Sequence, residues 1–272
     1  MSDQLTTRIA DRFRDLQSKN AKGLIVYLTA GDPNLDATGD LLLALDRAGV
    51  DVIELGVPFS DPLADGPVIQ RASERALRCG TTLRKILERF PLWRQTVRAP
   101  IILFSYFNPI LQYGLEKFAA SAAQAGVDGA LVVDLTAEEA EGYVRAMRAR
   151  NLDTVFLASP TSTDARLERA AQLSTGFFYL ISRTGVTGER SEMASSGRLL
   201  AERARRLTSL PLAIGFGIST AAQVREVQSY ADAAVVGSAV VHAIEERFDQ
   251  GGPAAIEKFV RGLKTGTEDQ PA

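Results

Sequence analysis

The stretch VIELGVPFSDPLADGP, residues 52–67, joins a short apolar run to an acidic loop. Its first residues are typical of a buried strand, and the Pro, Gly and Asp residues that follow are typical of a turn before a helix. Three carboxylates lie within it: Glu54, Asp61 and Asp65. A strand followed by a loop and a helix is the repeating unit of α/β folds. The stretch therefore indicates an α/β fold with acidic side chains placed at and just after a strand.

Seven further apolar runs of similar composition occur along the chain. Segments with apolar residues at i, i+3 and i+4 separate them, and this spacing is typical of amphipathic helices. Buried strands that alternate with helices favour a parallel sheet covered by helices. Eight such units in about 250 residues fit a closed (β/α)8 TIM barrel better than an open sheet. The eight runs begin at residues 24, 52, 101, 130, 154, 177, 212 and 233.

Two more helices are predicted outside the repeating units. Residues 1–17 carry charges and apolar residues at helical spacing, and residues 81–97 add a helix in the longer segment after the second strand. We expect one barrel domain over residues 1–265. The polar residues 266–272 are expected to form a disordered tail.

Composition excludes several classes of protein. The chain has 31 basic and 33 acidic side chains, a net charge of −2, and no dense basic stripe, which argues against a nucleic-acid partner. One cysteine, Cys79, and one histidine, His242, exclude a disulfide framework and a Cys/His zinc site. No apolar run approaches the roughly 18 residues of a membrane helix. We recognise no transit peptide and expect a cytoplasmic protein, or one of the plastid stroma if the source is a plant.

The acidic loop can be interpreted in two ways. Barrel enzymes build their sites from the loops that follow the strands. Glu54 closes the second apolar run, so we expect it at or near the barrel mouth, where burial would raise its pKa and suit it to proton transfer. Alternatively, Glu54 is a paired structural acid and Asp65 caps a helix that starts near Pro67. Both interpretations remain open on these residues alone.

Glycines follow the seventh and eighth strands, in IGFGIS (214–219) and VVGSAVV (235–241). Loops seven and eight of such barrels commonly bind phosphate, because glycine allows close approach and a helix N-terminus supplies N–H donors. The candidate residues are Gly215, Gly217, Gly237 and Ser238.

The segment SRTGVTGERSEMASSG, residues 182–197, shows no apolar periodicity. Long connections of this kind are typical of functional lids. Gly185, Thr187 and Gly188 would let it close over a substrate. A tolerated surface insertion is the alternative.

Several motifs together resemble one known family. ELGVPFSDPLADGPVIQRA resembles the signature segment of the tryptophan synthase alpha chain family. YLTAGDP, SRTGVTG, GFGIS and VVGSA resemble its other landmarks in the same order, so the match covers about residues 15–265. The resemblance implies a barrel that cleaves indole-3-glycerol phosphate to indole and glyceraldehyde 3-phosphate, a retro-aldol reaction, without a metal or organic cofactor.

The resemblance also assigns roles to residues of this sequence. Glu54 and Asp65 match the two catalytic acids: one moves protons, and the other stays ionised to stabilise charge that develops on the indole nitrogen. The positions matching the phosphate site are Gly188, Gly217, Gly237 and Ser238. The positions matching the pocket and its closing loop are Tyr27, Phe104, Tyr106, Tyr179, Gly185, Thr187 and Phe216.

A partner is implied as well. By resemblance, the loop with Asp61 and Pro62 faces a tryptophan synthase beta chain, a pyridoxal-phosphate enzyme, in an alpha2beta2 complex. Thr136 stands where the family usually has proline, in a second loop expected near that partner. Two alternatives remain: another phosphate-binding barrel lyase or isomerase, and a catalytically weak barrel that acts mainly as an activator of the beta chain.

Overall fold

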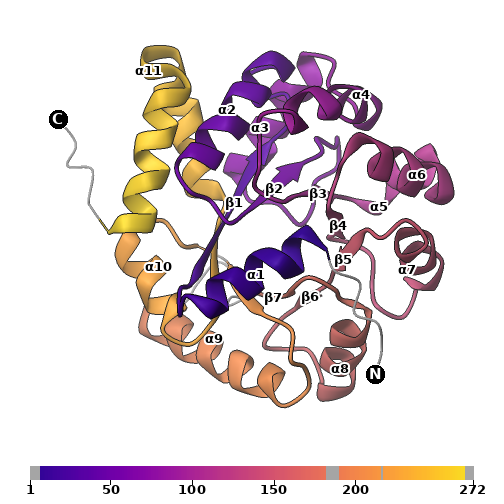
Figure 1. The fold of residues 1–272 in the computed structure, drawn as a ribbon, viewed down its shortest axis with the longest axis vertical. Coiled ribbons are helices and arrows are strands. Elements are labelled where there is room, and N and C mark those ends of the chain that lie inside the picture. Colours follow the sequence, from indigo (N-terminus) through magenta and orange to yellow (C-terminus); the bar gives the residue numbers. More distant parts are fainter. Residues whose placement is uncertain (1–6, 182–189, 216, 267–272) are drawn as a thin grey trace.

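A computed structural model describes residues 7–181, 190–215 and 217–266, the side chains of residues 190–195 excepted. The described residues form a (β/α)8 barrel of parallel strands, as predicted (Figure 1). All eight apolar runs of the sequence form strands, and the fifth run forms two short ones. These are β1 (Gly23–Thr29), β2 (Val52–Gly56), β3 (Ile101–Ser105), β4 (Gly129–Val132), β5 (Asp153–Val155), β6 (Leu157–Ala158), β7 (Phe178–Ile181), β8 (Leu212–Gly215) and β9 (Ala233–Val236).

The fifth predicted strand is divided in two. β5 pairs with β4 and β6 pairs with β7, so the two pieces of one segment join the two ends of the sheet and close the barrel. A single continuous run was expected there. It is interrupted at Phe156, whose amide donates to the Ser174 hydroxyl at 3.2 Å instead of to a neighbouring strand.

Helices surround the barrel, and the two additional helices predicted from the sequence are among them (Figure 1). α11 consists of two limbs that meet at Gly252, whose φ of 58° is non-helical. The predicted tail at 266–272 lies outside the described residues from 267 onward. The helices are α1 (Arg8–Ser18), α2 (Leu35–Arg47), α3 (Pro67–Arg78), α4 (Leu83–Arg94), α5 (Phe107–Tyr113), α6 (Leu115–Ala125), α7 (Glu141–Arg148), α8 (Asp164–Leu173), α9 (Arg190–Arg205), α10 (Ala221–Gln228) and α11 (Ser238–Thr265).

One expectation about the connection after the sixth apolar run is wrong. Residues 182–197 were expected to be irregular, but α9 begins at Arg190. The small and polar residues of its first turns, SEMASSG, obscure the helical period in the sequence. No helix in the described ranges is long and apolar enough to cross a membrane.

Alternation along the strands divides the core into two parts. Residues such as Leu24 and Val26 pack outward against the helices, whereas Ile25 and Val52 point into the barrel. α1 lies across one end of the barrel and buries Phe13 against its interior (Figure 1). Because this end is closed by a helix, the opposite end, where the strands terminate, is left for a site.

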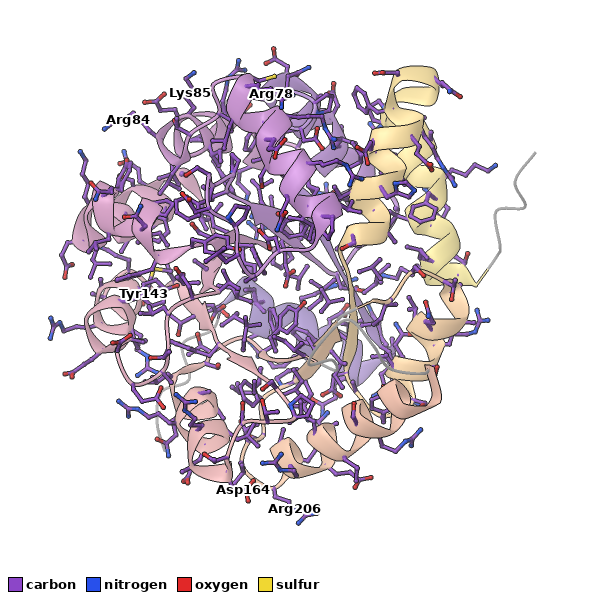
Figure 2. The ribbon with its side chains drawn as sticks, turned by 180° about the vertical axis from the view of Figure 1, so that it is seen from behind. Arg78, Arg84, Lys85, Tyr143, Asp164 and Arg206 are labelled. Carbon is purple, nitrogen blue, oxygen red and sulfur yellow. The ribbon has the colours of Figure 1, made fainter. Side chains whose placement is uncertain are left out.

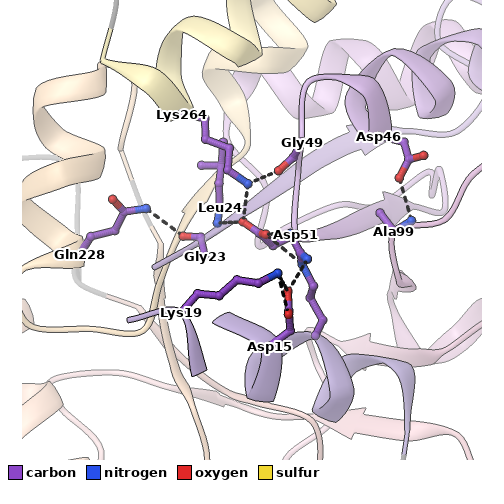
Figure 3. A network of polar contacts seen from close by, with 11 residues as sticks. Asp15, Lys19, Gly23, Leu24, Asp46, Gly49, Asp51, Ala99, Gln228 and Lys264 are labelled. Atoms are coloured by element: carbon purple, nitrogen blue, oxygen red, sulfur yellow. Dashed lines mark hydrogen bonds and ion pairs between the residues drawn. The ribbon is translucent and has the colours of Figure 1, made fainter. Parts of the chain in front are cut away.

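A polar network reinforces the closed end, and Asp51 is its centre (Figure 3). The Asp51 side chain is 0% exposed. It accepts hydrogen bonds from the Leu24 amide at 2.7 Å, from Arg12 Nε at 3.0 Å and from Lys264 Nζ at 3.0 Å. These contacts join α1, β1 and the end of α11 to the start of β2. Asp51 is therefore a fully paired structural acid.

Candidate active site

A cavity of about 710 Å³ lies at the open end of the barrel. Strands β1, β2, β3, β7 and β9 contribute to its wall, as do the loops after β2, β8 and β9. It brings together eight of the residues singled out in the sequence. These are Tyr27, Glu54, Asp65, Phe104, Tyr179, Gly217, Gly237 and Ser238.

Glu54 is the most deeply buried acid of this cavity. It lies in the middle of β2, opposite Tyr27 and Ile102, and not at the end of the strand as predicted. The residue is 1% exposed, and its Oε1 has no hydrogen-bond partner within the described part of the chain. Burial without compensation raises the pKa of Glu54 to about 8. The alternative interpretation as a paired structural acid is therefore wrong.

Asp65 lies in the loop between β2 and α3 and is half-buried. Burial raises its pKa to about 6, while the hydrogen bond with the Tyr106 hydroxyl opposes this rise. The loop is held in place because the Ala64 amide donates to the Tyr106 hydroxyl at 2.9 Å and Gln70 Nε2 donates to the Asp65 carbonyl at 2.9 Å. Asp65 does not cap α3. Gly66 is the N-cap residue of that helix.

The two carboxyl groups thus differ in charge near neutral pH. At pH 7 a group with a pKa of about 8 retains its proton, and a group with a pKa of about 6 has mostly lost it. Titratable pairs whose environments separate their pKa values in this way are typical of acid–base catalysis.

Two tyrosines lie beside these acids inside the barrel. A β carbon at Gly56 would lie 2.1 Å from the Tyr27 hydroxyl, and one at Gly215 would lie 2.4 Å from the Tyr179 hydroxyl. The two strand glycines therefore make room for the rings. Tyr27 also packs edge-on against Phe104, with the ring centroids 5.2 Å apart. Together these rings form an apolar wall suited to a flat aromatic ligand.

Beside Tyr27, the cavity is bordered by a helix N-terminus without a cap. Gly237 is the N-cap residue of α11 and makes no side-chain cap hydrogen bond, whereas Thr220 and Gln223 form a capping box on α10. The first N–H groups of α11 are therefore available to an anion in the cavity. Gly217 has a φ of 71°, which favours glycine, and like Ser238 it lines the cavity.

The other predicted site residues lie elsewhere. Gly185, Thr187, Gly188 and Phe216 are outside the described residues. Tyr106 contacts the Asp65 loop and does not line the cavity itself. Asp61 and Pro62 belong to the same loop but lie away from the cavity, next to Leu63, which is 93% exposed.

Sequence reasoning missed several apolar residues of the wall. Val133, Leu157 and Ile181 lie at inward positions near the carboxyl ends of their strands. Strand alternation counted back from each loop could have identified them. His242 is exposed on α11 and also lines the cavity. Within the ranges described, no group of three or more His, Cys, Asp or Glu residues could hold a metal ion.

Comparison with known proteins identifies the family. The family model described as tryptophan synthase alpha chain matches residues 13–267. The chain belongs to the tryptophan synthase alpha chain family. The tryptophan synthase alpha chain of Solibacter usitatus is 54% identical over 261 residues, which cover 96% of this chain and 98% of that relative. The one from Geotalea uraniireducens is 47% identical over 262 residues, with the same coverage.

Solved structures agree with this membership. A crystal structure of tryptophan synthase subunit alpha from Legionella pneumophila superposes with a TM-score of 0.88 at 35% identity, covering 96% of this chain and 98% of that one. A structure of Mycobacterium tuberculosis tryptophan synthase gives a TM-score of 0.86 at 36% identity, with the same coverage. The fold and family predicted from the sequence motifs are confirmed. Another phosphate-binding barrel lyase or isomerase is no longer an alternative.

Proposed function

We propose that this cavity carries out the reaction of the tryptophan synthase alpha chain family, the cleavage of indole-3-glycerol phosphate to indole and glyceraldehyde 3-phosphate, with Glu54 and Asp65 as its catalytic acids. The observation that supports these roles best is the environment of Glu54, a buried carboxyl group without a hydrogen-bond partner for Oε1 in the described structure. Such a group keeps its proton at neutral pH and faces the cavity in which a substrate would bind.

Glu54 would transfer two protons in this reaction. Breaking the bond between indole C3 and the side chain requires a proton on C3 and loss of the proton from the adjacent side-chain hydroxyl. Protonated Glu54 donates to C3, and the resulting carboxylate accepts the hydroxyl proton as the carbon–carbon bond breaks. The electron pair of that bond returns to the ring, the aldehyde forms, and Glu54 ends the cycle protonated.

Asp65 would stabilise the charge that this step creates. Protonation of C3 leaves a positive charge on the ring nitrogen, and an ionised carboxylate that accepts a hydrogen bond from the ring N–H lowers its energy. Asp65 has the lower pKa of the two acids, and the Tyr106 hydroxyl favours its charged form. Tyr27, Phe104 and Tyr179 would enclose the indole ring.

The phosphate group would bind at the start of α11. Gly217, Gly237 and Ser238 line this part of the cavity, and the uncapped helix N-terminus supplies N–H donors and a favourable dipole. Family resemblance adds Gly188. Every step uses groups of this chain alone, so we propose that it needs no metal or organic cofactor.

The partner proposed for this chain is a tryptophan synthase beta chain, with pyridoxal phosphate bound only there and an alpha2beta2 assembly. The exposed Leu63 beside Asp61 and Pro62 supports the assignment of this loop to the interface. Thr136 is also exposed, in the turn after β4. The relatives named above come from bacteria, and we propose a cytoplasmic location and a single domain over residues 1–265.

Release of glyceraldehyde 3-phosphate from indole-3-glycerol phosphate tests these roles. The purified chain is mixed with a tryptophan synthase beta chain, and Glu54→Gln is compared with the surface variant Glu257→Gln. We expect Glu54→Gln to lose about 10²- to 10⁴-fold in kcat/KM and the surface variant to retain activity. Full activity of Glu54→Gln would reject its role. A folded wild-type chain that binds the beta chain without turnover would instead favour an activator.

A further inference from the structure

Four charged residues connect α3 to the first limb of α11. Arg71 and Arg75 lie one turn apart on α3, Glu245 lies in the second turn of α11, and Asp32 follows β1. We refer to these four residues as the α3–α11 clamp. α3, which ends at the labelled Arg78, lies beside α11 when the barrel is seen from the side opposite α1 (Figure 2).

The clamp consists of paired, well-aligned hydrogen bonds. Arg71 contacts both oxygens of Glu245, through Nε at 3.2 Å and Nη2 at 2.9 Å. Arg75 contacts both oxygens of Asp32, at 2.8 Å and 2.9 Å, and reaches Glu245 Oε1 with Nη1 at 2.7 Å. The Asp32 side chain is 4% exposed and that of Glu245 25% exposed. Bidentate arginine–carboxylate pairs in such partly buried positions fix geometry more strongly than isolated surface pairs.

The helices that the clamp joins lead to the two parts of the candidate site that flank β1. α3 follows the Asp65 loop directly, and Gln70 on α3 holds the Asp65 carbonyl at 2.9 Å. α11 begins at Gly237 and Ser238, where phosphate would bind. Asp32 follows β1, which pairs with both β2 and β9. The clamp therefore spans the strand that lies between the acid side and the phosphate side.

We propose that Glu245 is a positioning residue that sets the distance between the acid side of the site and the phosphate cradle. This inference rests on the function proposed above. Glu245 accepts hydrogen bonds from Arg71 and Arg75 of α3, so it is the single side chain of α11 through which the described clamp contacts pass. A substrate that holds its phosphate at one end and its reacting carbon at the other needs this distance to be fixed, because small misplacements reduce rates strongly.

The test compares Glu245→Gln with Glu257→Gln, both in the full chain with its beta-chain partner. Glu257 is a matched control, because it lies on the same helix, is 24% exposed and pairs with Arg261 of that helix. Steady-state kinetics give kcat and KM for indole-3-glycerol phosphate. Calorimetry gives the affinities for two fragments, indole and glycerol 3-phosphate, each of which reaches only one end of the site.

Removing the Glu245 carboxylate from the clamp should change the kinetics only of a ligand that spans the site. We expect kcat/KM of Glu245→Gln to fall about tenfold or more, with kcat lowered and KM raised, while both fragments bind as they do to the wild type. The control should match the wild type in all of these quantities.

Three results would overturn the inference. The first is kcat/KM equal to that of the control, and the second is a lower melting temperature with unchanged kinetics, which would make Glu245 merely structural. The third is parallel loss of fragment binding, which would show that Glu245 shapes one end only. Glu54→Gln distinguishes the failure of the underlying function: if that variant is fully active, the site assignment itself is rejected and the clamp proposal with it.

Discussion

Asp51 lies directly before β2, and Glu54 lies three residues further on, within that strand. Both are buried acids, but their surroundings are opposite. Asp51 belongs to the closed end of the barrel, where Arg12, Lys264 and the Leu24 amide all donate to it. Glu54 faces the open end, where Oε1 has no partner in the described structure. The difference is one of pairing, not of depth, since both side chains are nearly inaccessible.

This contrast assigns stability to Asp51 and chemistry to Glu54, only three residues apart in the sequence. A buried carboxylate with two cations and an amide around it is compensated and holds α1, β1 and α11 together. A buried carboxyl group without compensation keeps its proton at a cost in stability, and that proton is what the proposed reaction uses.

The largest effect is expected for Asp51→Asn. Removing the charge leaves Arg12 and Lys264 without their shared carboxylate, and breaking a buried pair typically costs about 3 kcal/mol or more in unfolding free energy. Urea denaturation measures it, with Asp11→Asn, an exposed ion-pair variant on α1 whose partner Arg14 is not a partner of Asp51, as a control that should change far less. At temperatures where the variant is folded, kcat should be unchanged. A large loss of kcat in folded Asp51→Asn would contradict the separation of the two ends.

Glu54→Gln should instead stabilise the fold. The pKa of Glu54 is about 8 in the folded chain against 4.5 in the unfolded chain, so folding at pH 7 is penalised by about 3 kcal/mol that a glutamine avoids. The folded state binds more protons than the unfolded state between these pKa values. The free energy of unfolding of the wild type should therefore equal that of the variant below pH 4.5. As pH rises from 4.5 to 8, it should fall progressively below that of the variant. A variant less stable than wild type at pH 7 would show that Glu54 is compensated after all.

The pH dependence of kcat/KM should be bell-shaped. Activity falls below about pH 6 because Asp65 becomes neutral, and it falls above about pH 8 because Glu54 loses the proton that it must donate. A pH series of glyceraldehyde 3-phosphate release measures both limbs. Flat activity from pH 5 to 9 would be incompatible with the assigned roles.

The smallest effect is expected for Tyr106→Phe. The Tyr106 hydroxyl lowers the pKa of Asp65, so its removal should move the acid limb to higher pH and leave the alkaline limb in place. Tyr143→Phe is a suitable control, because Tyr143 is buried at the barrel periphery, where its hydroxyl donates to the Ala130 carbonyl (Figure 2). A shift of the alkaline limb alone would show that the roles proposed for Glu54 and Asp65 are reversed.

Much of the fold was predictable because parallel strands buried on both sides must be continuously apolar. Runs such as 24–29 and 212–216 therefore stood out in the sequence. The break at Phe156 was not predictable, since it depends on a hydrogen bond to Ser174 across the α8 connection. Nor was the first half of α9, where small residues replace the apolar stripe.

The identity of the two catalytic candidates was predictable from the sequence, but the pairing of their carboxyl groups was not. Glu54 and Asp65 stand out through their position and their motif. No pattern in the sequence shows, however, that the buried acid just before β2, Asp51, is paired and that the buried acid within it, Glu54, is not. Pairing depends on Arg12 and Lys264, which come from opposite ends of the chain. The α3–α11 clamp likewise joins Arg71 to Glu245, 174 positions away. Contacts of this kind are decided by the folded barrel alone.

The most direct test is a titration of the Glu54 carboxyl group itself. Infrared difference spectra between the wild-type chain and Glu54→Gln isolate the C=O stretch of a protonated carboxyl group, followed from pH 4 to pH 10. We predict that this band is present at pH 7 and disappears around pH 8, because burial without a partner holds the pKa there. A band already lost near pH 4.5 would show an ordinary, compensated carboxylate and would contradict the proposed role of Glu54.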